Sequence, residues 1–266
     1  MPVMMVDVKP LSPRLKAMYE NKFTLEYHKA MKLQNDGEVE ILPFDMAKKL
    51  TKQKVIYTAI YGSKDRLPQY PSFSSDYDYV CFTDNKKLMA ENWTVIYREG
   101  VSSDPTRSAR WLKTHPHKLF PNHARSVWVD ANIRFKTGYL QRLYAASGNF
   151  VGLQHWQEVK GVYDEARRCI MQSKDDPKTI EKQCARYRSE GLPELIDILW
   201  TALLIRNHNE QNIVEFDEMW WDEINKGSRR DQLSFPYCVW KLKMPYVKIK
   251  GFGNFFKRLN HLCPSN

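Results

Sequence analysis

Ser126-Val-Trp-Val-Asp-Ala-Asn-Ile133 is a short apolar run that leads into a carboxylate and a carboxamide two residues apart. A strand of about 4–8 apolar residues bounded by polar groups is typical of the middle of a parallel sheet, because both of its faces are covered. Side chains alternate along a strand, so we expect Trp128, Asp130 and Asn132 to lie on one side. Open α/β sheets bind ligands at the carboxyl ends of their strands, and two oxygen ligands there suit Mg²⁺ or Mn²⁺. The alternative interpretation is an Asp and an Asn that cap a turn.

The bulk composition is that of a folded protein. The chain has 266 residues, of which 42% are hydrophobic and 27% charged, and this suits one large α/β domain or two small ones. There is no apolar run of about 18 residues and no signal-peptide pattern, so we expect a cytoplasmic location. The five cysteines are scattered without a C-x-x-C pair, which argues against a disulfide framework and a zinc site.

The net charge of +10 favours anionic partners, such as nucleotide phosphates, an acidic glycan, a membrane surface or nucleic acid. The basic residues are dispersed and form no RNA-binding, zinc-finger or basic-zipper motif. We therefore expect no nucleic-acid partner, and peripheral contact with an anionic membrane is left open. The sequence does not indicate an oligomeric state.

The order of apolar runs and helix signals predicts a single α/β domain at residues 54–266, preceded by a packed helical extension at residues 1–53. In the extension, Ser12-Pro13 starts a helix that reaches about Leu33. Strands are predicted at 54–62, 76–84, 93–97, 126–133, 149–156, 200–206 and 246–249. Helices are predicted at 105–115, 139–146, 162–172, 177–190, 212–225 and 231–242.

Three further groups are candidates for a site. Arg107, Arg110 and Lys113 share one face of the helix that begins at Pro105, where they either contact phosphate or form a solvated face. His155 ends a strand and is either a structural hydrogen-bonding residue or a catalytic one. Asp231 and Gln232 open a helix, where a carboxylate also has a purely structural role as a cap.

The order of these segments resembles one family, the glycosyltransferase-like domain best known from plant proteins of mucilage and turgor regulation, with many bacterial relatives. The matching segments are Val55-Ile-Tyr-Thr-Ala-Ile-Tyr-Gly62, Asp78-Tyr-Val-Cys-Phe-Thr-Asp-Asn85, Pro116-His-Lys-Leu-Phe-Pro121, Trp128-Val-Asp-Ala-Asn-Ile133, Tyr163-Asp-Glu-Ala166, Leu204-Ile-Arg-Asn-His-Asn209, Trp220-Trp221 and Gly227-Ser-Arg-Arg-Asp-Gln-Leu-Ser-Phe235. They occur in order over about residues 54 to 242.

The resemblance implies a GT-A-like fold, with a mostly parallel central sheet flanked by helices, and transfer of a sugar from a nucleotide-sugar to a glycan or glycolipid acceptor. We expect a UDP-sugar ahead of a GDP-sugar. Asp130 and Asn132 would replace the D-x-D element that holds Mn²⁺ or Mg²⁺, with His261 as a third ligand. The resemblance also implies a set of nucleotide-binding residues: Thr58, Ala59 and Tyr61 around the nucleotide, Asp84 at the base or ribose, and Arg107, Arg110 or Lys118 at the departing diphosphate.

Asp231-Gln232 resembles the D-Q element that lies near the reacting sugar in several GT-A families. In an inverting enzyme Asp231 would be the general base, whereas in a retaining enzyme Asp231 or Gln232 would orient or stabilise the oxocarbenium-like sugar. Two other interpretations stay open. One is a metal-dependent phosphohydrolase that uses Asp130 and Asp231, and the other is a non-catalytic glycan- or nucleic-acid-binding module, suggested by the charge and the 13% aromatic content.

Overall fold

The computed structural model describes residues 50–62, 65–67, 69–155, 159–250 and 256–259. The predicted helix between Ser12 and Leu33 and the candidate ligand His261 lie outside these ranges. Within them, no helix is long and apolar enough to cross a membrane.

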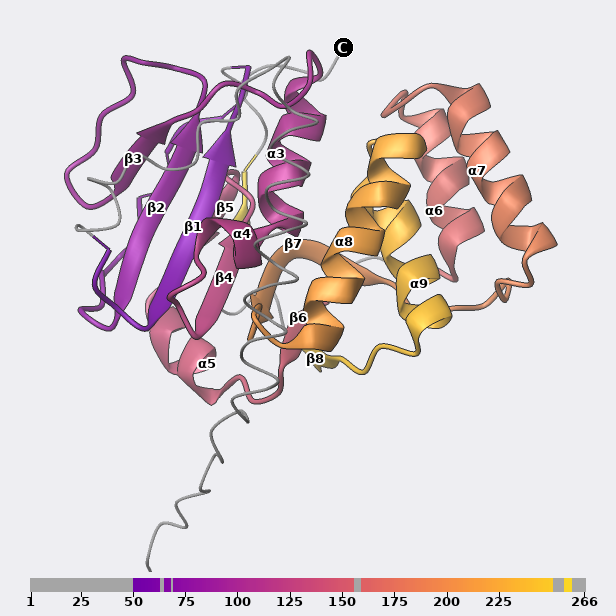
Figure 1. Cartoon of the computed structure of the whole chain (residues 1–266). Coiled ribbons are helices and arrows are strands. Elements are labelled where there is room, and N and C mark those ends of the chain that lie inside the picture. Colours follow the sequence, from indigo (N-terminus) through magenta and orange to yellow (C-terminus); the bar gives the residue numbers. More distant parts are fainter. Residues whose placement is uncertain (1–49, 63–64, 68, 156–158, 251–255, 260–266) are drawn as a thin grey trace, which may run out of the picture. The chain divides into compact units, whose positions relative to one another are not determined.

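The centre of the described part is a sheet of seven strands in the order β3-β2-β1-β4-β7-β6-β8 (Figure 1). In chain order these strands are β1 (Lys54–Ile60), β2 (Tyr77–Thr83), β3 (Thr94–Tyr97), β4 (Arg125–Val129), β6 (Phe150–Gln154), β7 (Leu199–Arg206) and β8 (Val247–Ile249). Only β7 runs against its neighbours: it is antiparallel to both β4 and β6, while the remaining pairs are parallel. The predicted α/β class with a mostly parallel sheet is therefore confirmed.

Burial follows the position of each strand in the sheet. Every residue of β2 and of β7 is buried, as expected for strands that are covered on both faces. β8 lies at the end of the strand order and is largely exposed, as expected for an edge strand. The long apolar runs of the sequence thus mark the interior strands.

Two helix starts are fixed by an aspartate followed by a proline. Asp104 accepts a hydrogen bond from the backbone N–H of Thr106 at 2.8 Å, and Asp176 accepts one from Thr179 at 2.8 Å. The helices are α3 (Pro105–Thr114), α4 (Pro116–Leu119), α5 (Tyr139–Ala145), α6 (Val162–Met171), α7 (Pro177–Ser189), α8 (Gln211–Lys226) and α9 (Asp231–Leu242). The six helices predicted within the described ranges are all present, and α4 is a short additional helix that the sequence analysis did not predict.

The predicted strand at 126–133 is wrong in one respect. β4 ends at Val129, a turn follows, and β5 (Ile133–Phe135) pairs antiparallel with β9 (Phe256–Arg258) in a second small sheet. The turn closes through a hydrogen bond from the N–H of Ile133 to the carbonyl of Asp130, 2.9 Å long. The side chains of Asp130 and Asn132 are therefore placed by a turn, and the alternation of a continuous strand does not apply.

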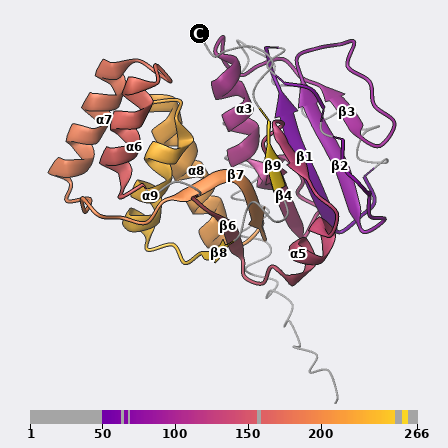
Figure 2. The same ribbon diagram turned by 180° about the vertical axis from the view of Figure 1, so that it is seen from behind.

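The two faces of the sheet are covered differently. Tyr57 and Trp128 face α3, and the hydroxyl of Tyr57 donates to the carbonyl of Lys113 at 3.2 Å. The opposite face, seen in Figure 2, packs against α5 and the β5–β9 pair through an aromatic cluster that includes Phe135 and Tyr139. Helices α6, α7, α8 and α9 form a contiguous group in which α8 contacts α3 and α9 contacts β7.

A fully buried ion pair connects the central sheet to helices α3 and α8. Arg206 of β7 donates to Asp217 of α8 at 2.7 Å, to the Tyr57 hydroxyl at 2.8 Å and to the carbonyl of Lys113 at 2.6 Å. Both charged side chains have no solvent exposure. One guanidinium therefore connects β7, α8, β1 and α3.

Replacement of Arg206 by Met should lower the free energy of unfolding by about 3–5 kcal/mol, because it leaves Asp217 as an unpaired buried charge. Equilibrium urea unfolding measures this change. The matched control is Lys226→Ala, which breaks an exposed pair with Asp222, 2.8 Å apart, and should cost no more than about 1 kcal/mol. Similar small losses in both variants would show that the buried network does not stabilise the fold.

Candidate functional site

A cavity of about 320 Å³ opens at the carboxyl ends of β1 and β4. Its wall also includes the first turns of α3 and α9, one face of α6, and the start of β7, which runs in the opposite direction. This is the edge at which open α/β sheets bind their ligands. The described structure thus has a cavity at the place where the sequence predicted a site.

A glycine turn brings the end of β1 close to the start of α3. Gly62 has a φ of +65°, and a Cβ at this position would lie 3.0 Å from the Cγ of Pro105. The N–H of Gly62 donates to the Asp84 carboxylate at 2.9 Å. A side chain at position 62 would therefore strain the turn and push α3 away from the cavity.

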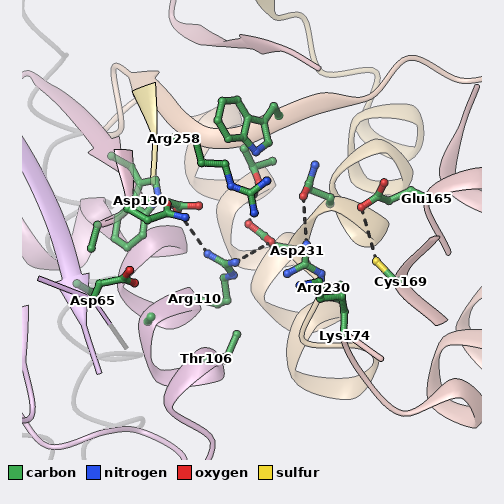
Figure 3. Close-up of a pocket in the computed structure, with 18 of the residues that line it drawn as sticks. Asp65, Thr106, Arg110, Asp130, Glu165, Cys169, Lys174, Arg230, Asp231 and Arg258 are labelled. Atoms are coloured by element: carbon green, nitrogen blue, oxygen red, sulfur yellow. Dashed lines mark hydrogen bonds and ion pairs between the residues drawn. The ribbon is translucent and has the colours of Figure 1, made fainter. Parts of the chain in front are cut away.

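Three charged side chains of the cavity wall, Arg110, Asp130 and Asp231, form an ion-pair network with Lys113, which is fully buried and does not line the cavity (Figure 3). Arg110 lies 3.6 Å from the Asp130 carboxylate and 3.2 Å from that of Asp231. Lys113 lies 3.6 Å from Asp130 and donates to Asp231 at 2.5 Å. Two cations from α3 thus bridge a carboxylate at the end of β4 and a carboxylate at the start of α9.

Asp231 has both oxygens occupied. Oδ1 faces Arg110, while Oδ2 accepts from Lys113 and, at 2.8 Å, from the hydroxyl of Thr201. Burial alone raises the pKa of Asp231, but Arg110, Lys113 and Arg230 outweigh it and hold the pKa well below its ordinary range. An efficient general base needs an accessible oxygen and a pKa near the working pH, so this arrangement suits Asp231 to holding cations more than to accepting a proton.

Lys113 is completely buried and lies near two indole rings. Its Nζ is 5.6 Å from the ring centre of Trp128 and 5.7 Å from that of Trp220. Burial lowers the pKa of Lys113, and the two neighbouring carboxylates oppose that shift. The buried ammonium group is therefore paired on both sides, as a charge in a protein interior must be.

The oxygen atoms near the turn give a limited set of metal ligands. Asp130 Oδ1 already accepts from the indole N–H of Trp128 at 2.7 Å, which leaves Oδ2 for another ligand. The amide nitrogen of Asn132 donates to the carbonyl of Leu259 at 3.2 Å. In the described part of the chain, no three His, Cys, Asp or Glu side chains are grouped so that they could hold a metal ion. Asp130 and Asn132 would fit an ion that arrives with phosphate oxygens and keeps its waters.

Eight of the sequence-predicted residues line the cavity together: Ala59, Tyr61, Arg110, Asp130, Asn132, His155, Asp231 and Gln232. The side chain of Thr58 is buried on the opposite face of β1 with Ile56 and Ile60, as strand alternation requires. Asp84 is exposed, and its carboxylate holds the Gly62 turn.

Two predicted cations have other partners. Arg107 donates to the carbonyls of Ile224 and Gly227 at the carboxyl end of α8, the second at 2.8 Å. Lys118 pairs with Glu218 at 2.6 Å on α8. The spacing of Arg107 and Arg110 correctly put both on one side of α3, but only Arg110 reaches the cavity.

Sequence reasoning missed other cavity residues as site candidates, including Asp65, Glu165, Arg168, Lys174, Arg230 and Arg258. Glu165 and Arg230 fall in segments that carry the family resemblance, so a local signal existed for them. Lys174 lies in the α6–α7 loop and Arg258 in β9, where no local pattern distinguishes them from surface cations.

The fold and the cavity define an α/β domain with a polar, cation-rich ligand site at the carboxyl ends of its strands. The chain belongs to the TOD1/MUCI70 family of glycosyltransferase-like domains, whose model matches residues 15–261, and the resemblance seen in the sequence is confirmed. A curated relative is the probable hexosyltransferase MUCI70 of Arabidopsis thaliana, 27% identical over 164 residues that make up 57% of this chain. The match spans 28% of that relative's length.

Solved glycosyltransferase structures also resemble the chain at low identity. Mouse xyloside xylosyltransferase 1 is 10% identical with a TM-score of 0.40, covering 74% of this chain and 84% of that one. The mannosyltransferase Ktr4p from S. cerevisiae is 8% identical with a TM-score of 0.43, covering 81% of this chain and 73% of that one. Similarity at this level supports no inference about individual residues.

Replacement of Asp231 by Asn should destabilise the protein by about 3–5 kcal/mol at neutral pH, because Lys113 and Arg110 lose a buried partner. The pKa of Asp231 in the folded state lies below its ordinary value of 3.8, so its contribution to stability is present above that pH and is lost as the pH falls below it. The difference between wild type and variant should therefore narrow below about pH 4 in urea unfolding experiments. Asp222→Asn, at an exposed pair, is the control and should show little change at either pH. A variant as stable as wild type at neutral pH would contradict this role.

Proposed function

We propose that this domain is a glycosyltransferase that moves a sugar from a nucleotide-sugar donor to a glycan or glycolipid acceptor. The observation that supports it most is a surplus of buried hydrogen-bond donors around the cavity. Among the described residues, Arg110 Nε, Arg230 Nε and Gln232 Nε2 are buried and have no acceptor. Buried donors without partners are costly, so the cavity suits a ligand rich in acceptor oxygens, such as a sugar diphosphate.

The half of the cavity between β1 and α3 is the proposed donor site. Ala59 and Tyr61 at the end of β1 would contact the nucleotide, and Thr106 lies in the first turn of α3. The amino terminus of a helix carries partial positive charge and favours phosphate groups. α3 and α9 both turn their first residues toward the cavity.

The leaving nucleotide diphosphate gains negative charge as the bond to the sugar breaks. Cations that are already in place stabilise this charge more in the transition state than in the ground state. Arg110 is the central candidate, because Asp130 and Asp231 hold it between the two carboxylates, with Lys113 buried beside it. Arg258 of β9 adds a further cation to the same cavity.

A divalent Mn²⁺ or Mg²⁺ ion, if it arrives with the nucleotide, would be held by Asp130 and Asn132 and would supply additional charge neutralisation at the diphosphate. In this proposal Asp231 positions Arg110 and Lys113, and Gln232 donates to an oxygen of the acceptor next to the reacting sugar. His155 also lines the cavity and is the remaining candidate for proton transfer.

Isothermal titration with UDP and GDP, each with Mn²⁺ and with EDTA, tests the donor site. We expect UDP to bind, and Arg110→Ala to weaken binding by about tenfold or more, since a hydrogen bond to a charged group contributes about 1.5–3 kcal/mol. Arg167→Ala, at an exposed arginine whose ion pair among the described residues is with Asp164, should leave the affinity unchanged. Asp130→Ala should abolish any enhancement by Mn²⁺.

The same titration includes a labelled oligonucleotide. Salt-sensitive oligonucleotide binding without nucleotide uptake would contradict the transferase proposal and favour a binding module. A thermal melt of each variant separates loss of binding from loss of folding.

A further inference from the structure

We propose that the cavity has a second anion-binding subsite, formed by Lys174, Arg168 and Gln232, which takes a carboxylate or phosphate group on the acceptor. The inference rests on the proposed transferase function and adds the chemical class of the acceptor. It starts from two cations that line the cavity, Lys174 and Arg258. Neither has an ion pair with any carboxylate of the described residues.

These two cations lie on different sides of the cavity. In Figure 3 the side chain of Arg258 extends from the side of Asp130 toward Asp231, and Lys174 lies on the other side, beyond Arg230. A single diphosphate held near Arg110 and Arg258 leaves the Lys174 side without an anion. A second negative group in the same cavity would therefore belong to the other substrate.

The position of Lys174 is fixed by its backbone. Its N–H donates to the carbonyl of Cys169 at 2.9 Å, and its own carbonyl accepts from the Arg229 guanidinium at 3.1 Å. The next residue, Asp175, accepts from the hydroxyl of Ser228 at 2.6 Å and from the N–H of Arg229 at 2.8 Å. The α6–α7 loop is thus tied to the segment that leads into α9, and Lys174 is held beside the cavity.

Gln232 supplies an oriented donor to the same region. It is 7% exposed, and its Oε1 accepts from the Arg230 guanidinium at 3.3 Å. Because arginine only donates, the carboxamide oxygen must face Arg230, so the amide nitrogen points elsewhere. Nε2 has no acceptor among the described residues, and an oxygen of a bound ligand would satisfy it.

The acidic side chains nearby do not cancel this charge. Glu165 is buried, accepts from the thiol of Cys169 at 3.6 Å, and interacts electrostatically with Arg230. Asp164 lies 3.6 Å from Arg168, whose side chain is 34% exposed. Glu165 therefore interacts with Arg230, and Asp164 with Arg168. Neither carboxylate forms an ion pair with Lys174, so the Lys174 ammonium group can bind an anionic ligand.

Carboxylates and phosphates both accept several hydrogen bonds from lysine, arginine and amide N–H groups. The expected acceptor thus carries an acidic sugar or a phosphorylated group close to the hydroxyl that receives the new bond. Neutral sugars lack the charge that Lys174 would pair with. The selectivity of the enzyme among acceptors would then depend on this subsite more than on the donor site between β1 and α3.

The test titrates D-glucuronate, glucose 6-phosphate and D-glucose into protein saturated with UDP, with binding followed by NMR. We expect at least one of the two anionic sugars to bind about tenfold more tightly than glucose, because a hydrogen bond to a charged group contributes about 1.5–3 kcal/mol. The one that binds identifies the anionic group as a carboxylate or a phosphate. Lys174→Ala should remove the preference without changing the affinity for UDP.

Lys182→Ala is the matched control, because this lysine is exposed on α7 and does not line the cavity. Equal binding of all three sugars, or an anion preference that survives Lys174→Ala, would overturn the subsite while leaving UDP binding, and hence the transferase proposal, intact. Failure of UDP to bind would instead overturn the donor site. The same sugar titrations without UDP would then show whether Lys174 still selects anions.

Discussion

The contact between Lys113 and Asp231 is the interaction on which the cavity depends. It joins α3 to α9 across 118 positions of sequence at a distance of 2.5 Å, with both side chains buried. The backbone of each residue is also fixed by a hydrogen bond: the carbonyl of Lys113 accepts from Arg206, and the carbonyl of Asp231 accepts from the indole of Trp220 at 3.0 Å. Two elements far apart in the chain are thereby fixed relative to each other before any ligand arrives. A site that is ordered in advance spends little binding energy on reorganisation.

Much of the fold was predictable because its signals are local. Asp-Pro pairs begin α3 and α7 through hydrogen bonds that span only two or three residues, and fully covered strands require the apolar runs seen in the sequence. The location of the site followed from a general property of open sheets, so Asp130 and Asn132 were found from their place after a strand. Asp231 and Gln232 were singled out by their resemblance to a D-Q element, since the helix start alone indicates only a cap.

The remaining features depend on contacts that no local pattern encodes. The break after Val129 is set by the pairing of β5 with residues more than a hundred positions later, including a reciprocal bond between Asn132 and Leu259 at 2.8 Å and 3.2 Å. The sequence spacing puts Arg107 and Arg110 on the same side of α3. Arg107 nevertheless binds carbonyl groups at the end of α8, whereas Arg110 lines the cavity. Asp231 looked like a helix cap or a base in the sequence. Arg110 and Lys113 of α3, together with Arg230 directly before α9, give it a different electrostatic environment.

The ion pairs show which of the chain's positive charges are available to attract an anionic ligand. Arg110 and Lys113 are neutralised internally by Asp130 and Asp231, so they provide an ordered frame in addition to charge. Further attraction for an anion comes from cavity cations without an ion pair among the described residues, and from buried N–H groups that have no acceptor there. Leaving such a donor unsatisfied costs about 1–3 kcal/mol, which a ligand oxygen recovers on binding. Recognition by this cavity is therefore expected to favour ligands that place acceptor oxygens at several fixed points, and net charge alone would be a weak basis for selectivity.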